Sequence, residues 1–181
     1  MKKVVLTFGL ISAVILSAEL FITMVLVSNG TLDHSVVLGY STMLLALLMV
    51  FFGIRSYRDN VNGGTITFWK GVQVGLLISL FACAGYVISW EIYYYNWGGD
   101  FIAHYTSHVL AKLRASGASD AEIAAKTVEM ADFAKLYANP VINVLFTFLE
   151  VIPVGLIVTL VSAAILRRAS AGGDTAQTVA A

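Results

Sequence analysis

The chain has 181 residues, of which 59% are hydrophobic and only 12% are charged, and its mean hydropathy is +0.84. This composition leaves too little polar surface for a soluble globule of that length. Basic and acidic residues balance to a net charge of zero, so the overall charge gives no reason to expect a nucleic-acid partner.

Long apolar runs dominate the chain, and each is predicted to form a membrane-spanning helix. A hydrocarbon core about 30 Å thick needs roughly 20 mostly apolar residues, and the runs approach or exceed that length. We therefore expect an all-α integral membrane protein, a four-transmembrane-helix bundle that forms a single membrane domain over residues 1–168. The predicted spans are residues 4–27, 36–54, 72–95 and 141–166.

Basic residues gather before the first run, between the second and third, and after the fourth. The positive-inside rule then places both termini in the cytoplasm. Residues 169–181, rich in Ala, Gly and Thr, are predicted to be a disordered cytoplasmic tail. Arg55, Arg58 and Lys70 in the second connection either contact lipid headgroups or a cytoplasmic partner, or only anchor the topology.

The segment between the third and fourth runs is too long for a simple link, and it is predicted to form an external two-helix hairpin over residues 100–138. Its first helix is expected to start with Asp100 as N-cap and to stop at Gly117. Its second helix should start at a capping box of Ser119 and Glu122 and end before Pro140.

Asp100, His104 and His108 follow one another at helical spacing on the first hairpin helix. Two imidazoles and a carboxylate at this spacing could share one metal ion, but an exposed helix face explains them equally well. They are weak candidates, and we predict neither a metal nor a cofactor.

Glu19, Glu91 and Glu150 are the ionisable acids inside the predicted spans, and no basic residue accompanies them there. A carboxylate in hydrocarbon is costly, so such groups face a polar interior and are protonated or paired.

Glu19 and Glu150 each belong to a polar stripe, a row of polar residues along one face of a helix. Helical spacing places Ser12 and Thr23 beside Glu19, and Asn143 and Thr147 beside Glu150. If the stripes face each other, they form a pocket in the outer half of the bundle that binds a proton, a cation or a small ligand, with Glu91 near its mouth. The alternative is that protonated glutamates only hold the bundle together through hydrogen bonds.

Small residues at four-residue spacing predict close helix packing in the third and fourth spans: Gly71, Gly75, Ser79 and Cys83, and Gly155, Thr159 and Ala163. The alternative function is therefore a structural or accessory protein that docks a partner through these faces or through the hairpin. The expected partners are the lipid bilayer and a second copy or another membrane protein, with no nucleic acid. No nucleotide loop or catalytic motif is present, so we predict no enzyme activity.

Residues 52–59, the pair Trp90-Glu91, the segment 139–155 and the pair Arg167-Arg168 resemble the domain of unknown function 4199 family. The resemblance covers nearly the whole chain. It implies a multi-pass membrane protein of the bacterial inner membrane, and it supplies no activity for any residue.

Overall fold

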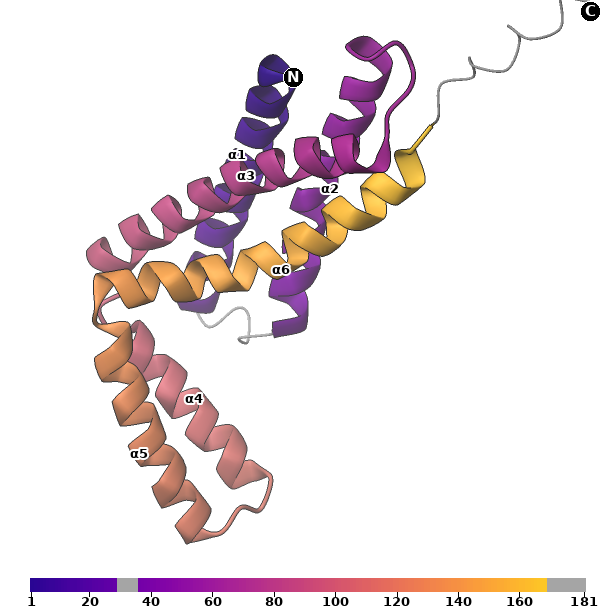
Figure 1. The fold of residues 1–181 in the computed structure, drawn as a ribbon. Helices are drawn as coiled ribbons and strands as arrows, with labels where there is room; N and C mark the ends of the chain where they lie inside the picture. Colours follow the sequence, from indigo (N-terminus) through magenta and orange to yellow (C-terminus); the bar gives the residue numbers. More distant parts are fainter. Residues whose placement is uncertain (29–35, 169–181) are drawn as a thin grey trace, which may run out of the picture. The chain divides into compact units, whose positions relative to one another are not determined.

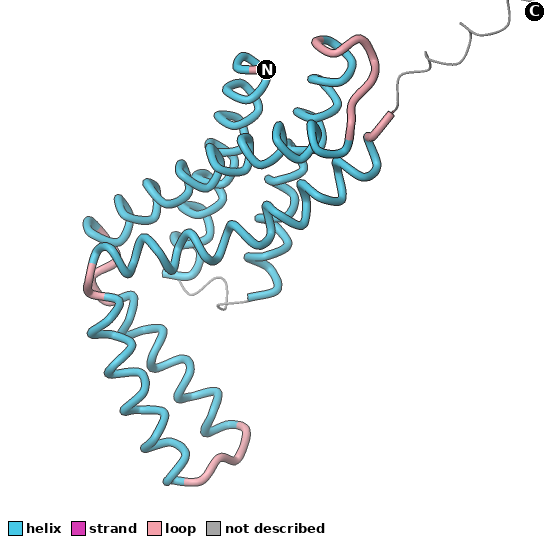
Figure 2. The backbone as a smooth tube through the Cα atoms, viewed as in Figure 1, coloured by secondary structure: helices cyan, strands magenta, loops and turns pink. Residues whose placement is uncertain are grey.

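The described chain is helical almost throughout (Figures 1 and 2). The computed structural model describes residues 1–28 and 36–168, and the tail predicted at 169–181 lies outside the described residues. Within these ranges there is no strand, only one isolated β-bridge between Ile66 and Arg168. The helices are α1 (Lys2–Ser28), α2 (Val36–Asn60), α3 (Phe68–Asn96), α4 (Phe101–Ala115), α5 (Asp120–Tyr137) and α6 (Pro140–Leu166).

The four apolar helices predicted from the sequence are confirmed. By length and composition, four stretches of the described chain could cross a membrane: Lys2–Val27, Gly39–Asn60, Phe68–Asn96 and Pro140–Leu166. They belong to α1, α2, α3 and α6, in the predicted order.

The helix that contains the second predicted span extends beyond that span. The apolar run stops at Ile54, but α2 continues to Asn60. The polar side chains of this last part pair along the helix, because Arg55 lies 3.6 Å from Asp59 and Asn60 donates to Ser56 at 3.2 Å. Such pairs one turn apart stabilise a helix that apolar pattern alone does not predict.

The structure falls into two compact units. Unit 1 contains Met1–Gly85 and the chain from Val151 onward, so it holds α1, α2, the first part of α3 and the second part of α6. Unit 2 is Tyr86–Glu150, with the end of α3, the helices α4 and α5, and the start of α6.

In unit 1, the small-residue stripes of α3 and α6 pack closely, as their spacing predicts, and the structure shows that they pack against each other. A methyl group placed on Gly71 would lie 3.1 Å from the Ala163 Cβ, and one on Gly75 would lie 2.7 Å from the Thr159 Cγ2. The Ser79 and Thr159 hydroxyls are 3.2 Å apart. These faces are therefore covered within the chain itself.

The two N-terminal helices of unit 1 also contact each other closely. A methyl group on Gly53 of α2 would lie 3.2 Å from the Phe8 Cβ of α1, so the start of α1 meets the end of α2. The buried apolar side chains between the helices of this unit include Leu16, Leu20, Leu47, Val50, Ile54 and Ile78.

In unit 2, α4 and α5 pack against each other and follow the predicted start and stop signals. Gly117, with φ of 82°, comes just after the C-cap of α4. The capping box of Ser119 and Glu122 is formed at the start of α5. Asp100 is the N-cap of α4, but its side chain makes no capping hydrogen bond.

Candidate functional site

The Glu19 carboxylate is the centre of a polar contact between two apolar helices of unit 1. Glu19 is half-buried on α1, and the Thr42 hydroxyl of α2 donates to its Oε1 at 2.6 Å. Thr23, one turn further along α1, donates to the same oxygen at 3.5 Å. The predicted pairing of Glu19 with Thr23 is thus present, and Thr42 adds a link to a second helix.

The Thr42 hydroxyl has more acceptors than hydrogens. Its Oγ1 lies 2.6 Å from Glu19 Oε1 and 2.9 Å from the carbonyl oxygen of Gly39. A threonine hydroxyl carries one hydrogen and two lone pairs, so it donates fully to only one of these oxygens. The arrangement can therefore respond to a proton on the carboxyl group.

Ser12, the other member of the predicted stripe, is fully buried, and its Oγ has no hydrogen-bond partner among the described residues. It lies two turns before Glu19 on α1. No hydrogen bond joins Ser12 to Glu19 within the described chain.

The second predicted stripe lies in unit 2, where Asn143 and Thr147 are buried. The Trp90 indole N–H donates to Asn143 Oδ1 at 2.9 Å, and the Thr147 hydroxyl donates to the Asn143 carbonyl at 3.0 Å. An indole nitrogen can only donate, so the Asn143 oxygen must face Trp90. The Asn143 Nδ2 is then left without a partner among the described residues.

Tyr137 at the end of α5 completes this polar cluster. Its hydroxyl has Trp90 and Thr147 as hydrogen-bonding neighbours, and burial raises the pKa of its phenol well above the ordinary value. Aromatic rings surround it: Tyr94 at 5.6 Å, Phe133 at 5.4 Å and Phe146 at 6.2 Å between ring centroids.

The two other acids of the spans also belong to unit 2. Glu91 is half-buried, and its Oε1 is buried without a hydrogen-bond partner among the described residues. Glu150 is exposed and lies near enough to Tyr137 to interact with it electrostatically. Glu19 and Glu150 thus fall in different units, and the pocket between their stripes stays a prediction.

The weak metal candidates do not assemble. Among the residues that the structure describes, no three His, Cys, Asp or Glu side chains are grouped so that they could hold a metal ion, and this includes Asp100, His104 and His108. Both histidines are exposed on α4.

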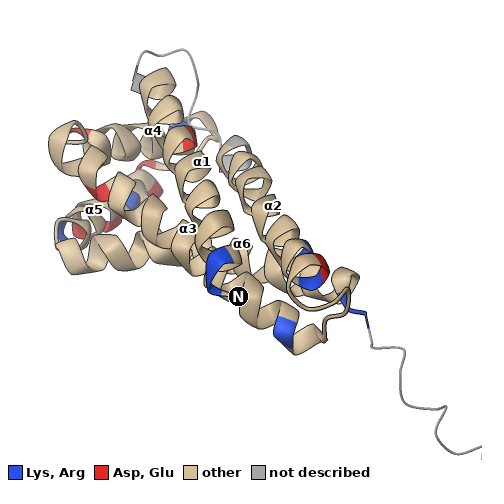
Figure 3. Cartoon of the chain, turned by 90° about the horizontal axis from the view of Figure 1, so that it is seen from above, with Lys and Arg blue, Asp and Glu red and all other residues tan. Residues whose placement is uncertain are grey.

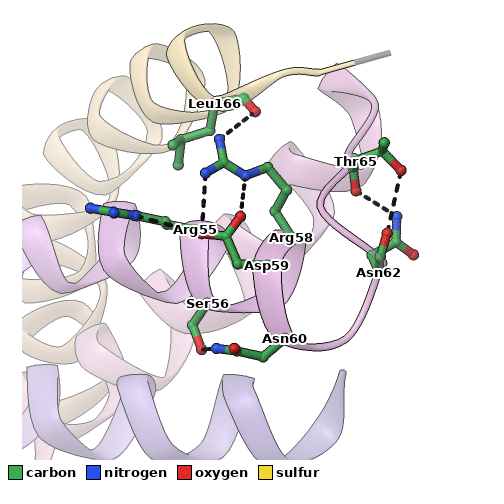
Figure 4. Close-up of polar contacts among 8 residues, drawn as sticks. All are labelled: Arg55, Ser56, Arg58, Asp59, Asn60, Asn62, Thr65 and Leu166. Carbon is green, nitrogen blue, oxygen red and sulfur yellow. Dashed lines mark hydrogen bonds and ion pairs between the residues drawn. The ribbon is translucent and has the colours of Figure 1, made fainter. Parts of the chain in front are cut away.

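The basic candidates of the second connection differ in their surroundings, and Figure 4 shows those of Arg55 and Arg58. Arg58 pairs with Asp59 and donates to the Leu166 carbonyl, whereas Arg55 is 58% exposed at its side chain. Lys70 donates to Gln73 at 2.8 Å.

Thr42 and Tyr137 are the site residues that sequence reasoning missed. For Thr42 a signal exists, since Ser41 and Thr42 interrupt the second apolar run with hydroxyl groups. For Tyr137 the sequence offers no such signal, because periodicity does not indicate which aromatic ring places its hydroxyl among polar groups.

These features define a helical protein with four helices long and apolar enough to cross a membrane, carrying polar clusters within them. The chain belongs to the family described as Protein of unknown function (DUF4199), whose model matches residues 7–168. The resemblance found in the sequence is therefore confirmed. No curated protein and no solved structure matches the chain.

Proposed function

We propose that this protein is a non-enzymatic integral membrane protein that binds a proton at Glu19 and couples that proton to the packing of α1 against α2. The observation that carries the proposal is the 2.6 Å contact between the Glu19 carboxyl group and Thr42, within two candidate membrane spans.

The contacts of Thr42 also accommodate a neutral carboxyl group on Glu19. A protonated Glu19 donates to the Thr42 oxygen, and Thr42 then donates to the Gly39 carbonyl at 2.9 Å, so each hydrogen has its own acceptor. An ionised Glu19 accepts the hydrogen bond from the Thr42 hydroxyl, which then no longer donates to the Gly39 carbonyl. In a lipid environment the neutral form also avoids the cost of an unpaired charge.

Binding or release of the proton therefore affects a contact between helices. Glu19 lies on α1, while Thr42 and Gly39 lie on α2, so release of the proton changes the hydrogen bond that joins the two helices. A bound monovalent cation would use the same carboxylate and hydroxyl oxygens, and it is the competing ligand for this site.

The expected location is the bacterial inner membrane with both termini in the cytoplasm, on the basis of the basic residues at one end of the spans. The lipid bilayer is the first partner. A second copy of the chain or another membrane protein is the second.

The test is infrared spectroscopy of the protein in lipid across a range of pH. We expect a band from a neutral carboxyl group that is absent in Glu19→Gln and shifted in Thr42→Val, because Thr42 is its hydrogen-bonding partner. Thr42→Ser keeps the hydroxyl and should keep the band position. Glu91→Gln is the matched control, since it removes another acid of the spans and should leave the Glu19 band unchanged.

Either of two results would contradict the proposal. One is a Glu19 band that is absent at every pH, as expected for a carboxylate that stays ionised. The other is a band that never responds to pH while Glu19→Gln only lowers stability, as expected for a structural acid. That second result would favour the alternative function, a structural or accessory protein.

The accessory function has a candidate surface on α5. The small-residue faces of α3 and α6 are covered by each other, whereas Val128 and Leu136 of α5 are 63% and 55% exposed. Partner capture that is lost in a Val128→Ser and Leu136→Ser double variant would support it.

A further inference from the structure

One end of unit 1 is strongly basic. Here α1 and α3 begin and α2 and α6 end, as shown by the approach of Gly53 to Phe8, of Gly71 to Ala163 and by the hydrogen bond from Arg58 to Leu166. In Figure 3 several blue stretches of the ribbon, which mark Lys and Arg, lie at this end of the four helices. Among the described residues its bases are Lys2, Lys3, Arg55, Arg58, Lys70, Arg167 and Arg168, and its acid is Asp59.

Arg58 makes its contacts within the fold, and we do not assign it to ligand binding. Its Nε and Nη2 contact the two Asp59 carboxylate oxygens at 2.6 and 3.2 Å, and its Nη1 donates to the Leu166 carbonyl at 3.4 Å. Its side chain is only 18% exposed. Because Leu166 is the last residue of α6, Arg58 ties the end of α2 to the end of α6.

Arg55 is held differently. Its Nε lies 3.6 Å from Asp59, while its side chain is 58% exposed and its terminal nitrogens extend away from Asp59 (Figure 4). One carboxylate thus serves two guanidinium groups, which leaves a net positive charge. The Nε of Arg55 is held near Asp59, and its terminal guanidinium nitrogens are exposed donors. Planar paired donors of this kind match the oxygens of a phosphate group.

The surroundings of Arg55 suit the headgroup region of a membrane. The start of α3 lies beside the end of α2, since a methyl group on Gly71 would be 3.6 Å from Ile54 Cγ2. Trp69, two residues earlier, is 75% exposed. Exposed Trp beside basic residues at the end of an apolar helix is typical of the membrane interface.

We propose that Arg55 binds the phosphate of an anionic phospholipid, while Arg58 holds the helix ends that position it. The proposal rests on the membrane placement given above, and it does not depend on the protonation of Glu19. The sequence places Arg55 and Arg58 in one group of basic residues, and the proposal gives them different roles.

The test is native mass spectrometry of the protein released from nanodiscs that contain phosphatidylglycerol and phosphatidylcholine in equal amounts. We expect wild type to retain phosphatidylglycerol preferentially and Arg55→Gln to lower this preference by about fivefold, the weight of one basic residue at a membrane surface. Arg55→Lys keeps the charge without the fork and should fall between them. Excess inorganic phosphate should leave the preference unchanged, because the lipid is the source of the phosphate group.

Three matched variants complete the experiment. Lys126→Gln removes a base on α5 that also pairs with a single carboxylate, Glu129, and it should retain the wild-type preference. Arg58→Gln should lower thermal stability, and Glu19→Gln should leave lipid retention unchanged. An unchanged preference in Arg55→Gln, or an equal loss in Lys126→Gln, would overturn the proposal. Displacement by inorganic phosphate would overturn the assignment to lipid.

Discussion

Single side chains decide how the polar groups inside these apolar helices are satisfied. Asn143 is fully buried and has one partner for its oxygen, the Trp90 indole, but none for its Nδ2 among the described residues. A buried polar group that loses its partner costs more than the removal of both partners together. Because of this difference in cost, substitutions at Trp90 and Asn143 are a sensitive test of the packing in unit 2.

We predict that Trp90→Phe lowers the free energy of unfolding by about 1–3 kcal/mol, because the Asn143 oxygen is then buried without a donor. The double variant Trp90→Phe with Asn143→Leu should lose less than the sum of the two single variants, since no polar group is left unpaired. Denaturation of the four proteins in detergent measures this coupling. Strictly additive losses would show that the two side chains do not interact.

At the scale of helices, close contact between α3 and α6 depends on residues without bulk. A methyl group on Gly75 would lie 2.7 Å from the Thr159 Cγ2 and 3.0 Å from the Ile54 Cδ1, so it must displace two neighbours. Among the residues that the structure describes, nothing lies within 4 Å of a methyl group placed on Gly39, which is also helical. The same substitution should therefore have opposite effects at the two positions.

Gly75→Ala is predicted to destabilise the protein by roughly 1–3 kcal/mol through overpacking. Gly39→Ala should leave stability unchanged or raise it, because alanine is the better helix former by about 1 kcal/mol. Thermal unfolding of both variants in the same detergent is the measurement. Equal effects at the two positions would contradict the packing of α3 against α6.

The start of α5 should depend on pH. Hydrogen bonds from the backbone N–H and the hydroxyl of Ser119 lower the pKa of the Glu122 carboxyl group below its ordinary value. The stabilisation is present above the unfolded pKa and is lost as the pH falls through the lower folded pKa. The protection of the amides in the first turn of α5, measured relative to their intrinsic exchange rates, should therefore fall in acid, and Glu122→Gln should remove this fall.

The helices could be predicted because their signals are local. Apolar length predicts the spans, and the capping box at Ser119 predicts the start of α5. Apolar length alone does not predict where α2 ends, since the pairing of Arg55 with Asp59 extends the helix beyond the apolar run. The contact of Glu19 with Thr42 could not be predicted, because it depends on which faces of α1 and α2 meet.

At the scale of the whole molecule, the sequence could predict the polar stripes of the site but not how those stripes are brought together. Polar residues on one helix predict a stripe, but only tertiary packing decides what that stripe contacts. The stripe at Glu19 meets Thr42 of α2, whereas Asn143 and Thr147 meet Trp90 and Tyr137 within unit 2. These two polar clusters of the described helices therefore belong to different units, and each has its own partners.

The charges of the chain predict its orientation in a membrane, and the single cysteine provides a way to test that prediction. Cys83 is buried, so Cys83→Ala provides a background in which one introduced cysteine reports one position. Val61→Cys lies in the exposed turn after α2, and Ser116→Cys lies in the exposed turn between α4 and α5. Because basic residues surround the first turn, the positive-inside rule places it in the cytoplasm and the second turn outside. A membrane-impermeant maleimide added to intact cells should label Ser116→Cys at once and Val61→Cys only after permeabilisation. The reverse order would invert the topology and move the basic end, with Arg55, to the outer surface.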